Sequence, residues 1–464
     1  MSIKGRIKEW FWKFAVRHLK HVERETSWGG KVIVLNTGSV IGQEAVAMLQ
    51  ALHSRSVGGL LDHLKVLAKK GAKNFMAIFY VGYGHKSIGD CGVVTIFIEN
   101  VSMLVAKAIQ DWLLYNGQEA STRYINFATQ EFFNPHLSFA GEEIQENWRT
   151  FYVNGMPRVV VSLKERFPLK ETDNLGVYNK AIDARAFDIL RGFLPAGAST
   201  NLAWTSNFRQ VADHLMLLRH HPLEEVREVA RAIESACMEA FPSSFVHKKY
   251  EATEAYNKRW MTKHYYFETD SFTDFECSVP FSDFDGLAEY KEVLSTRPTK
   301  TELPKRLAEC GMIQFRFLLD FGSYRDIQRQ RAVIQRMPLL VTTHGFEQWY
   351  VNELPRDLQG EALTLLEEQR EAVEGLGLDK EVAQYYTPMG YRIPCVVTGD
   401  IPALVYLVEL RATKFVHPTL CKRAREMAKS LEEQLGKAGL VLHLDTEPNM
   451  FDVRRGEHDI KLKD

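Results

Sequence analysis

The chain has 464 residues, 45% hydrophobic and 25% charged, which is the composition of a globular protein too long for one ordinary core. Its net charge of −1 excludes a global attraction to nucleic acid or to a membrane surface, so any anion site depends on local arginines. No apolar run approaches the roughly 20 residues that span a bilayer, and the six cysteines lack metal-site or disulfide-framework spacing. We therefore expect a cytoplasmic protein with no integral membrane association, no nucleic-acid partner and no metal.

Residues 1–30 are predicted to form a basic amphipathic helix. Lysines and arginines separate apolar residues that recur at helical spacing, namely Ile3, Ile7, Trp10, Phe11 and Phe14. The segment lacks the continuous apolar core of a signal peptide. Packing on the chain's own body or on a sister subunit is favoured over a helix lying on a membrane surface.

The remaining elements alternate between strands and long helices. The β-branched and aromatic run 93–98 predicts a strand, and 315–318 predicts a second one. Helical patterns cover residues 102–115, 209–219, 223–239, 361–375 and 416–434, and 296–304 reads as a loop. The pattern predicts an α+β fold, with small, mostly antiparallel sheets flanked by long helices.

Four short matches in the same order indicate an internal repeat. The pairs are 107–110 with 325–328, 194–197 with 387–390, 217–219 with 409–411, and 227–231 with 425–429. The offset in residue number is 218 for the first pair (328 − 110) and falls to about 193 for the rest. We therefore predict two tandem domains, at 31–250 and 251–464, the second having lost about 25 residues between its motifs.

The arginines at 325, 329 and 331 are the first candidate site. On a helix, Arg325 and Arg329 share one face, and Arg331 can turn toward the same ligand if the helix ends near Gln330. Arginine suits a phosphate or a ring carbonyl because it is planar and permanently charged. A solvated basic face is the alternative interpretation.

A second candidate is the run from Glu119 to Tyr124. If the run is extended, Glu119, Ser121 and Arg123 point to one side, where a hydroxyl and a guanidinium could clamp a phosphate. The turn before it, residues 82–87, carries His85 and Ser87 beside glycines that allow close backbone approach. Chance matches and an ordinary tight turn are the alternatives.

Arg191 and Arg219 stand on otherwise apolar segments. Because a buried arginine needs an anionic partner, each points either to a ligand or to an internal carboxylate, with Asp213 and Glu224 as internal candidates.

Together these stretches resemble the flavin-dependent thymidylate synthases. The order of motifs carries the resemblance: Gly84-His85-Lys86-Ser87, then Gln118-Glu119-Ala120-Ser121-Thr122-Arg123-Tyr124, Arg191-Gly192-Phe193-Leu194-Pro195, Trp204-Thr205-Ser206-Asn207-Phe208-Arg209, and Leu218-Arg219. It covers most of residues 75–245 and, more weakly, 312–331 and 384–430. The resemblance implies two tandem copies of that family's domain.

The resemblance also implies roles for individual residues. It places the deoxyuridine monophosphate (dUMP) against Glu119, Ser121, Arg123, Arg191, Arg219 and Arg411. It places the flavin, FAD, near His85, Ser87, Asn207, Arg209 and the triplet Arg329-Gln330-Arg331, with Arg331 as the residue that polarises or orients the reacting groups. In this family methylenetetrahydrofolate supplies the one-carbon unit and NADPH the hydride, and the product is dTMP.

The departures from the family pattern are complementary. The family carries an Arg-His-Arg triplet, and the first copy has Asp111-Trp112-Leu113 in its place, whereas the second has Gln330 for the histidine. Where the first copy has the run from Glu119 to Tyr124, which we call the cradle, the second has Met337-Pro338-Leu339. The resemblance implies the homotetramer of that family, whose sites lie between subunits. We therefore expect one composite site per pair of copies and a homodimer of two-copy chains. A flavoenzyme that adds another group, such as hydroxymethyl, and a non-catalytic nucleotide- or flavin-binding protein remain as alternatives.

Overall fold

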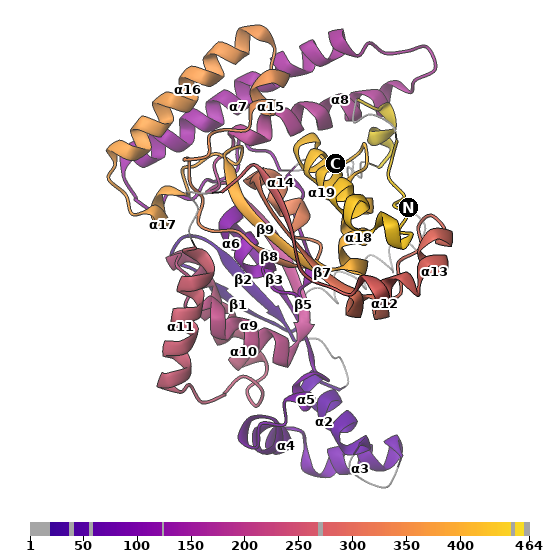
Figure 1. The fold of residues 1–464 in the computed structure, drawn as a ribbon. Helices are drawn as coiled ribbons and strands as arrows, with labels where there is room; N and C mark the ends of the chain where they lie inside the picture. Colours follow the sequence, from indigo (N-terminus) through magenta and orange to yellow (C-terminus); the bar gives the residue numbers. More distant parts are fainter. Residues whose placement is uncertain are drawn as a thin grey trace, which may run out of the picture. The chain divides into compact units, whose positions relative to one another are not determined.

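The computed structural model describes residues 19–36, 41–54, 59–122, 125–267, 272–446 and 451–458 (Figure 1). These residues form two compact units, which are described separately. Unit 1 comprises Met1–Val101, Leu114–Ala120 and Thr200–Thr262, and unit 2 comprises Ser102–Leu113, Ser121–Ser199 and Lys263–Asp464. Both units combine helices with an antiparallel sheet, which confirms the α+β fold. The units interleave along the chain, and the two tandem domains stay a prediction.

Unit 1 is built on a five-stranded sheet with the order β1-β2-β3-β5-β4. The strands are β1 His21–Glu25, β2 Lys31–Leu35, β3 Val93–Ser102, β4 Asn116–Glu119 and β5 Ser199–Asn207. Alternate side chains of β2 and β3 are fully buried, including Val32, Val34, Val94, Ile96 and Ile98, as expected when one face of a sheet is covered. The strand predicted at 93–98 is therefore confirmed.

The N-terminal helix prediction needs a correction at its end. Residues 1–18 lie outside the described part of the chain, whereas His21–Glu25 is a strand paired antiparallel with Lys31–Leu35. The segment from His21 onward therefore belongs to a strand of the sheet and the turn after it, and not to an amphipathic helix.

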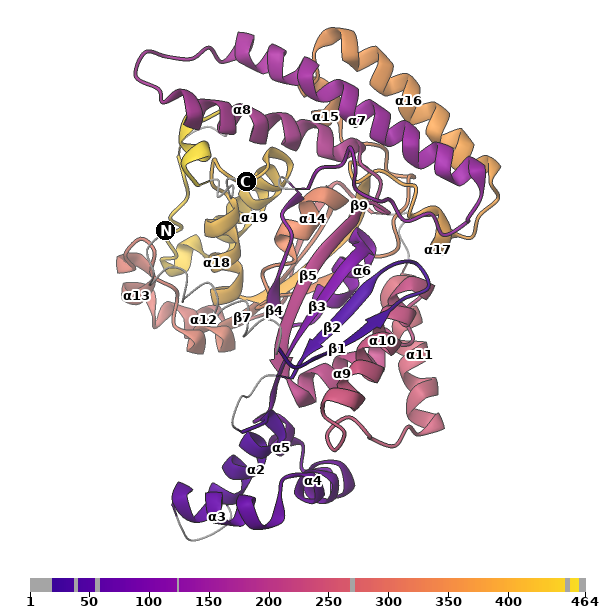
Figure 2. The same ribbon diagram turned by 180° about the vertical axis from the view of Figure 1, so that it is seen from behind.

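The helices of unit 1 cover one face of the sheet and form a small lobe. α10 (Glu224–Ala240) packs on β1 and β2 and contacts α9 (Phe208–Leu218), and both helices were predicted to within one residue. Figures 1 and 2 show the lobe, which contains α2 Gln43–His53, α3 Leu60–Lys70, α4 Lys73–Phe75, the π-helix η1 Met76–Gly82 and α5 Lys86–Gly89. α11 (Glu251–Tyr265) follows α10, and its last turn belongs to unit 2.

Unit 2 is built on a four-stranded antiparallel sheet with the order β6-β7-β9-β8. The strands are β6 Phe275–Ser282, β7 Gly311–Asp320, β8 Ile334–Arg336 and β9 Arg392–Asp400. The strand predicted at 315–318 is the centre of β7, where Phe315 and Phe317 are fully buried.

The helices of unit 2 fall into two groups. α18 (Ile401–Arg411) and α19 (Pro418–Leu435) pack on β7, as does α14 (Phe321–Ile327). The long helices α7 (Phe139–Arg166), α8 (Leu175–Leu190) and α16 (Arg356–Gly375) lie side by side, as Figures 1 and 2 show. The remaining helices are α6 Met103–Gln110, η3 Arg191–Phe193, α12 Phe284–Ala288, α13 Lys291–Thr296, η4 Lys305–Cys310, α15 Gln348–Glu353, α17 Lys380–Ala383, η5 Gly436–Ala438 and η6 Val453–His458.

The elements of the two sheets recur at the offsets seen in the sequence. β7 begins and ends 218 residues after β3 (311 − 93 and 320 − 102). β9 begins and ends 193 residues after β5 (392 − 199 and 400 − 207). The first offset is 218 and the second is 193, as in the sequence matches. The strand register recurs as well, because Asn116 pairs with Thr205 in one sheet and Ile334 with Thr398 in the other. The same order of elements therefore occurs twice in the chain.

Two loops within unit 2 exchange backbone hydrogen bonds. Ala196 N donates to Thr387 O, and Met389 N donates to Leu194 O. Gly197 N donates to Tyr385 O, and Gly390 N donates to Gly192 O. The four distances lie between 2.7 and 2.9 Å. Pro195 and Pro388 form an antiparallel bridge at the centre. Every bond has a partner bond in which donor and acceptor are both displaced by the second offset, which is the pattern of a local twofold contact.

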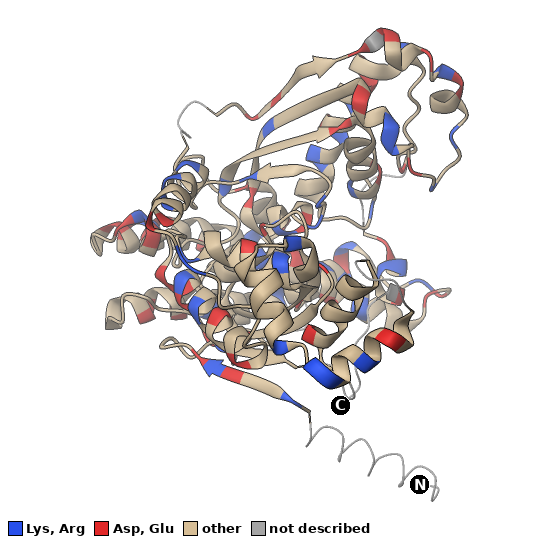
Figure 3. Cartoon of the chain, turned by 90° about the horizontal axis from the view of Figure 1, so that it is seen from below, with Lys and Arg blue, Asp and Glu red and all other residues tan. Residues whose placement is uncertain are grey.

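Surface charge is mixed in both units. Lysines and arginines alternate with acidic residues along the elements in Figure 3, in keeping with the near-zero net charge. All six cysteines are free thiols. Within the described ranges, no helix combines the length and the apolar character that crossing a membrane requires.

Candidate functional site

Four arginines act on the carboxylate of Asp326 in unit 2, and we call these five residues the arginine cluster. Arg191 Nη1 lies 3.8 Å from Asp326 Oδ2, and Arg329 Nη2 lies 3.7 Å from Asp326 Oδ1. Arg411 and Arg325 add their electrostatic influence on the same carboxylate. The cluster brings together Arg191, Arg329 and Arg411, three of the residues predicted to bind ligand.

The positions of these residues follow from the elements that carry them. Asp326 lies in α14 and Arg329 just after its end, while Arg411 is the last residue of α18. Arg191 begins the short helix η3 that follows α8. Arg191 comes from the first predicted repeat and the others from the second, so unit 2 combines residues of both.

A buried polar network fixes the guanidinium of Arg191, whose residue is only 8% exposed. Arg191 Nη2 donates to Ser323 Oγ at 3.1 Å. Ser323 Oγ also lies 3.1 Å from His417 Nδ1 and 2.7 Å from Thr419 Oγ1, and all of these side chains are buried. Because each member has several partners, Arg191 is held in one orientation.

Positive charge dominates the arginine cluster. Burial raises the pKa of Asp326, but the guanidinium groups of Arg191, Arg329, Arg411 and Arg325 outweigh it, and the net pKa is lowered. Burial lowers the pKa of Arg411, although a guanidinium remains charged at neutral pH. Asp188 and Asp320 also act on Arg191, so four cations meet three carboxylates and a smaller excess of positive charge remains for an anionic ligand.

Two guanidinium nitrogens of the cluster have spare hydrogen-bonding capacity. Arg191 Nε and Arg411 Nε are buried, and neither has a hydrogen-bond partner among the described residues. An unsatisfied buried donor costs about 1–3 kcal/mol, so native proteins rarely leave one without a ligand, ion or water. A ligand oxygen or an ordered water would satisfy these donors.

The triplet Arg329-Gln330-Arg331 does not present three side chains together. Arg329 and Arg331 are exposed, whereas Gln330 is buried. The backbone carbonyl of Gln330 accepts a 2.8 Å bond from Gln335 Nε2, which anchors the turn after α14. The two arginines thus face solvent at the edge of the cluster, on either side of an anchoring glutamine.

The predicted cradle is only partly described. Glu119 ends β4 in unit 1 and is half-buried, Ser121 is half-buried in unit 2, and Thr122 between the cradle positions is buried. Arg123 lies outside the described residues, so its predicted contact with a ligand stays a prediction.

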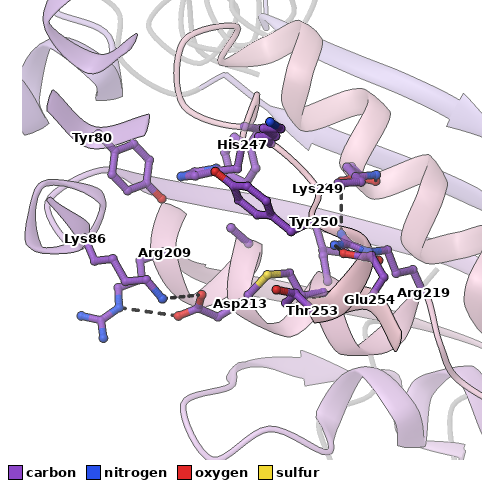
Figure 4. Close-up of a pocket in the computed structure, with 16 residues that line it drawn as sticks. Tyr80, Lys86, Arg209, Asp213, Arg219, His247, Lys249, Tyr250, Thr253 and Glu254 are labelled. Carbon is purple, nitrogen blue, oxygen red and sulfur yellow. Dashed lines mark hydrogen bonds and ion pairs between the residues drawn. The ribbon is translucent and has the colours of Figure 1, made fainter. Parts of the chain in front are cut away.

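A separate cavity of about 300 Å³ lies in unit 1 and contains two other predicted residues, Arg209 and Arg219 (Figure 4). Arg209 Nη1 is 3.0 Å from Asp90 Oδ2, and Lys86 Nζ is 3.5 Å from Asp213 Oδ1. The cavity is also lined by His247, Lys248, Lys249 and Tyr250, so its wall combines aromatic rings with cations.

Arg219 is neutralised within unit 1. It forms a two-pronged contact with Glu254, at 2.5 and 2.7 Å, and lies 3.4 Å from Glu234. The sequence had suggested Asp213 and Glu224 as internal partners of the buried arginines. Instead, Asp326 faces Arg191 and Glu254 faces Arg219, because the true partners come from other elements.

The other predicted flavin residues occupy local structural positions. Asn207 caps α9, its Oδ1 accepting from Gln210 N at 2.8 Å. His85 and Ser87 are exposed at the start of α5, after Gly84, whose φ of 70° suits the tight turn expected there. The contacts of these residues with a flavin stay a prediction.

Sequence reasoning missed Asp326, Ser323 and His417 as members of the site. Asp326 could have been noticed because it stands between two arginines of the motif, at 325 and 329. Ser323 and His417 carry no sequence signal, because their importance comes from packing against Arg191.

Comparison with known proteins bears on the first repeat. Residues 42–243 match the family described as thymidylate synthase complementing protein, which confirms the resemblance predicted from the motifs. Relatives called UPF0159 protein occur in Chlamydia muridarum (24% identical, 90% of this chain and 89% of the relative covered), Chlamydia pneumoniae (24%, 86% and 85%) and Thermoplasma acidophilum (23%, 82% and 90%). The family match supports a thymidylate synthase-related function.

Proposed function

Since residues 42–243 match the thymidylate synthase complementing protein family, we propose that this protein methylates dUMP to dTMP. Methylenetetrahydrofolate supplies the carbon and NADPH the hydride in this proposal, and FAD is the bound cofactor. The observation that carries the proposal is the arginine cluster, in which Arg191, Arg329 and Arg411 meet around one carboxylate.

The arginine cluster fits a nucleotide phosphate. A phosphate monoester carries close to two negative charges at neutral pH, which the excess positive charge around Asp326 attracts. Its oxygens can accept from Arg191 Nε and Arg411 Nε, which are buried without a described partner. The network of Ser323 and His417 orients the first of these donors before the ligand arrives.

The same residues fit the diphosphate of a flavin at the edge of the cluster. Arg329 and Arg331 are exposed there and present planar, multi-donor groups. When bound, FAD would carry the redox chemistry of the reduction. The chain's own residues would bind and orient the pyrimidine, with Arg331 polarising a ring carbonyl and the cradle of Glu119, Ser121 and Arg123 holding the nucleotide.

We also propose that the site is composite, because it unites two copies of one ancestral domain. Three observations support the duplication: the recurring strand offsets, the recurring strand register and the exchanged bonds between residues 192–197 and 385–390. Arg191 comes from one copy, and Arg329 and Arg411 come from the other. The family resemblance adds the proposal that two chains form a homodimer.

A non-catalytic nucleotide-binding protein is the second candidate. Two observations favour it: Arg219 is neutralised by Glu254 and Glu234, and Gln330 replaces the triplet histidine with a buried side chain. Such a protein would keep the arginine cluster and lose turnover.

The test begins with the visible spectrum of the purified protein, with and without dUMP. The proposal expects a bound flavin whose absorption changes when dUMP binds, and a product whose mass identifies dTMP. Conversion of dUMP to a hydroxymethylated nucleotide would replace the proposed reaction with a related one. Colourless protein that takes up no FAD, yet binds dUMP, would leave the non-catalytic function.

Arg191→Gln provides the matched variant, because glutamine already stands at the equivalent position of the second repeat, Gln384. The proposal expects dUMP affinity to fall by tenfold or more, since the cluster would lose its most buried cation. Unchanged dUMP affinity in a folded variant would contradict the assignment of the arginine cluster.

A further inference from the structure

The arginine cluster has a counterpart in unit 2 that is defined by the same offsets. The helices α6 and α14 begin alike: Ser102 Oγ accepts from Val105 N at 3.2 Å, and Asp320 Oδ2 accepts from Ser323 N at 2.8 Å. The two cap positions and the two donor positions are both related by the first offset (320 − 102 and 323 − 105). Positions in one helix can therefore be carried over to the other one by one.

Two of the counterpart positions have lost their positive charge, whereas a third keeps it as Lys107. By the first offset, Asp111 is the equivalent of Arg329 and Lys107 is the equivalent of Arg325 (329 − 111 and 325 − 107). By the second offset, Gln384 is the equivalent of Arg191 (384 − 191). A cation has become an acid at one position and a neutral amide at another.

The side chains at the counterpart bind one another. Asp111 Oδ2 lies 3.2 Å from Lys107 Nζ, 3.2 Å from His264 Nε2 and 3.4 Å from the hydroxyl of Tyr265, which donates to it. Lys107 is 4% exposed, and its Nζ sits 4.6 Å from the centre of the Tyr265 ring. We call these four residues the lysine cluster.

The electrostatics of the lysine cluster leave no excess charge. Burial opposes ionisation of Asp111, but Lys107 and His264 hold its pKa well below the usual value. The carboxylate thus neutralises the buried ammonium group. This contrasts with the arginine cluster, where one carboxylate faces four cations.

The backbone beside the lysine cluster is also closed. Leu339 N donates to Tyr265 O at 3.3 Å, and Leu340 N donates to Gln384 Oε1 at 3.2 Å. Met337 and Leu339, which replace the cradle residues in the second repeat, are almost fully buried. The end of α11 and the apolar residues Met337 and Leu339 therefore lie where the cradle of the second repeat would hold a ligand.

We propose that the chain carries a single nucleotide site, at the arginine cluster, and that the lysine cluster permanently closes its counterpart with the chain's own side chains. This inference rests on the proposed nucleotide-binding function. It specifies that function further, because it sets the binding stoichiometry at one dUMP per chain and assigns it to one of two equivalent places.

Isothermal titration of the full-length protein with dUMP, in the presence of FAD, tests the inference. The expected stoichiometry is one dUMP per chain. Arg191→Gln is expected to remove this binding or weaken it more than about tenfold. Two dUMP per chain would overturn the single-site inference and leave the proposed function standing, whereas no binding at all would overturn both.

Conservative changes in the lysine cluster provide the control. Tyr265→Phe removes the hydroxyl that donates to Asp111, and His264→Gln keeps a donor beside it. Both variants are expected to bind one dUMP with unchanged affinity, and circular dichroism would establish that each is folded. Binding that survives Arg191→Gln but is weakened tenfold by Tyr265→Phe would place the ligand at the lysine cluster and overturn the inference.

Discussion

At the scale of single residues, Ser323 links Arg191, which we propose binds the nucleotide, to the protein interior. Its hydroxyl accepts from Arg191 and meets His417 and Thr419, all within 3.1 Å. Arg191 itself makes only a loose ion pair with Asp326, at 3.8 Å. The orientation of the guanidinium therefore depends on a neutral hydroxyl more than on the opposite charge.

Ser323→Ala is predicted to weaken dUMP binding severalfold and to lower the free energy of unfolding by about 1–3 kcal/mol. The reason is that Arg191 Nη2 would lose its acceptor in a buried setting. Titration calorimetry and urea unfolding measure the two effects. Thr419→Ser keeps the neighbouring hydroxyl and is the control, expected to bind dUMP normally. Equal affinity in wild type and Ser323→Ala would contradict the positioning role.

The buried imidazole of His417 gives stability a pH dependence. Burial, followed by the charge of Arg191, holds the pKa of His417 well below its usual value. In the unfolded chain a histidine titrates near pH 6.5, so below that pH the unfolded state binds a proton that the folded state refuses. This contribution to stability is therefore present above about pH 6.5 and is lost progressively as the pH falls.

His417→Gln is accordingly predicted to make the decrease in the free energy of unfolding between pH 7 and pH 5 smaller than in the wild type. Urea unfolding at the two pH values measures the difference for wild type and variant. A variant whose stability falls as steeply as that of the wild type would show that another group carries the dependence.

At the scale of elements, the N-terminus of α14 is unusually well anchored. Asp320 is fully buried, and its Oδ2 accepts from Ser323 N at 2.8 Å and from the hydroxyl of Tyr350 at 2.7 Å. The equivalent cap of α18, Asp400, accepts only from Ala403 N among the described residues and is half-buried. The cap of α14, the helix that carries Arg325 and Asp326, thus makes one more hydrogen bond than the cap of α18.

Asp320→Ala is predicted to destabilise the protein by about 2–4 kcal/mol, because it removes a cap and leaves the buried Tyr350 hydroxyl without its acceptor. Asp400→Ala is expected to cost about 1 kcal/mol, since only a cap is lost. Thermal unfolding of the two variants measures the contrast. Similar losses in both would mean that the Tyr350 contact contributes nothing.

Local patterns predicted the elements that are amphipathic along one face. β3, α9 and α10 appeared at or near the expected residues because their burial alternates with the strand or helix period. α7 went unpredicted, since it carries a proline at position 157 and its apolar residues do not gather on one side. The strand β1, His21–Glu25, falls within the helix predicted for residues 1–30, because the helical spacing of Ile3 to Phe14 was extended past the residues that show it.

The candidate site was predictable only in part, for a physical reason. The sequence singled out the arginines of the candidate site because an uncompensated guanidinium on an apolar segment is costly. Their partners could not, since Asp326 and Glu254 belong to helices other than those that lead into Arg191 and Arg219. Which carboxylate meets which arginine is decided by how these separate helices pack.

At the scale of the whole molecule, the C-terminal segment of unit 2 packs on the long helices. η6 packs on α8, and Arg455 forms an ion pair with Asp188, which is fully buried. Phe451 stacks on Phe167 with 4.8 Å between ring centres. Asp188 lies one turn before Arg191, so this contact supports the helix that leads into the arginine cluster.

Arg455→Ala is predicted to cost about 3–5 kcal/mol, because it leaves the buried carboxylate of Asp188 without its countercharge. The double variant Asp188→Asn with Arg455→Ala should be more stable than Arg455→Ala alone, since the buried carboxylate that lost its ion pair is then neutral. Urea unfolding of the wild type and the variants measures the coupling. Additive losses would show that the two groups do not interact.

The exchanged backbone bonds around Pro195 and Pro388 have a consequence for how such a protein changes over time. Where two identical chains meet on a twofold axis, every substitution appears on both sides at once. Here the two sides are encoded separately, so a change at residues 192–197 leaves residues 385–390 as they were. One half could therefore keep Arg191 while the other accepted Gln384, an asymmetry that no symmetric pair of identical chains can acquire.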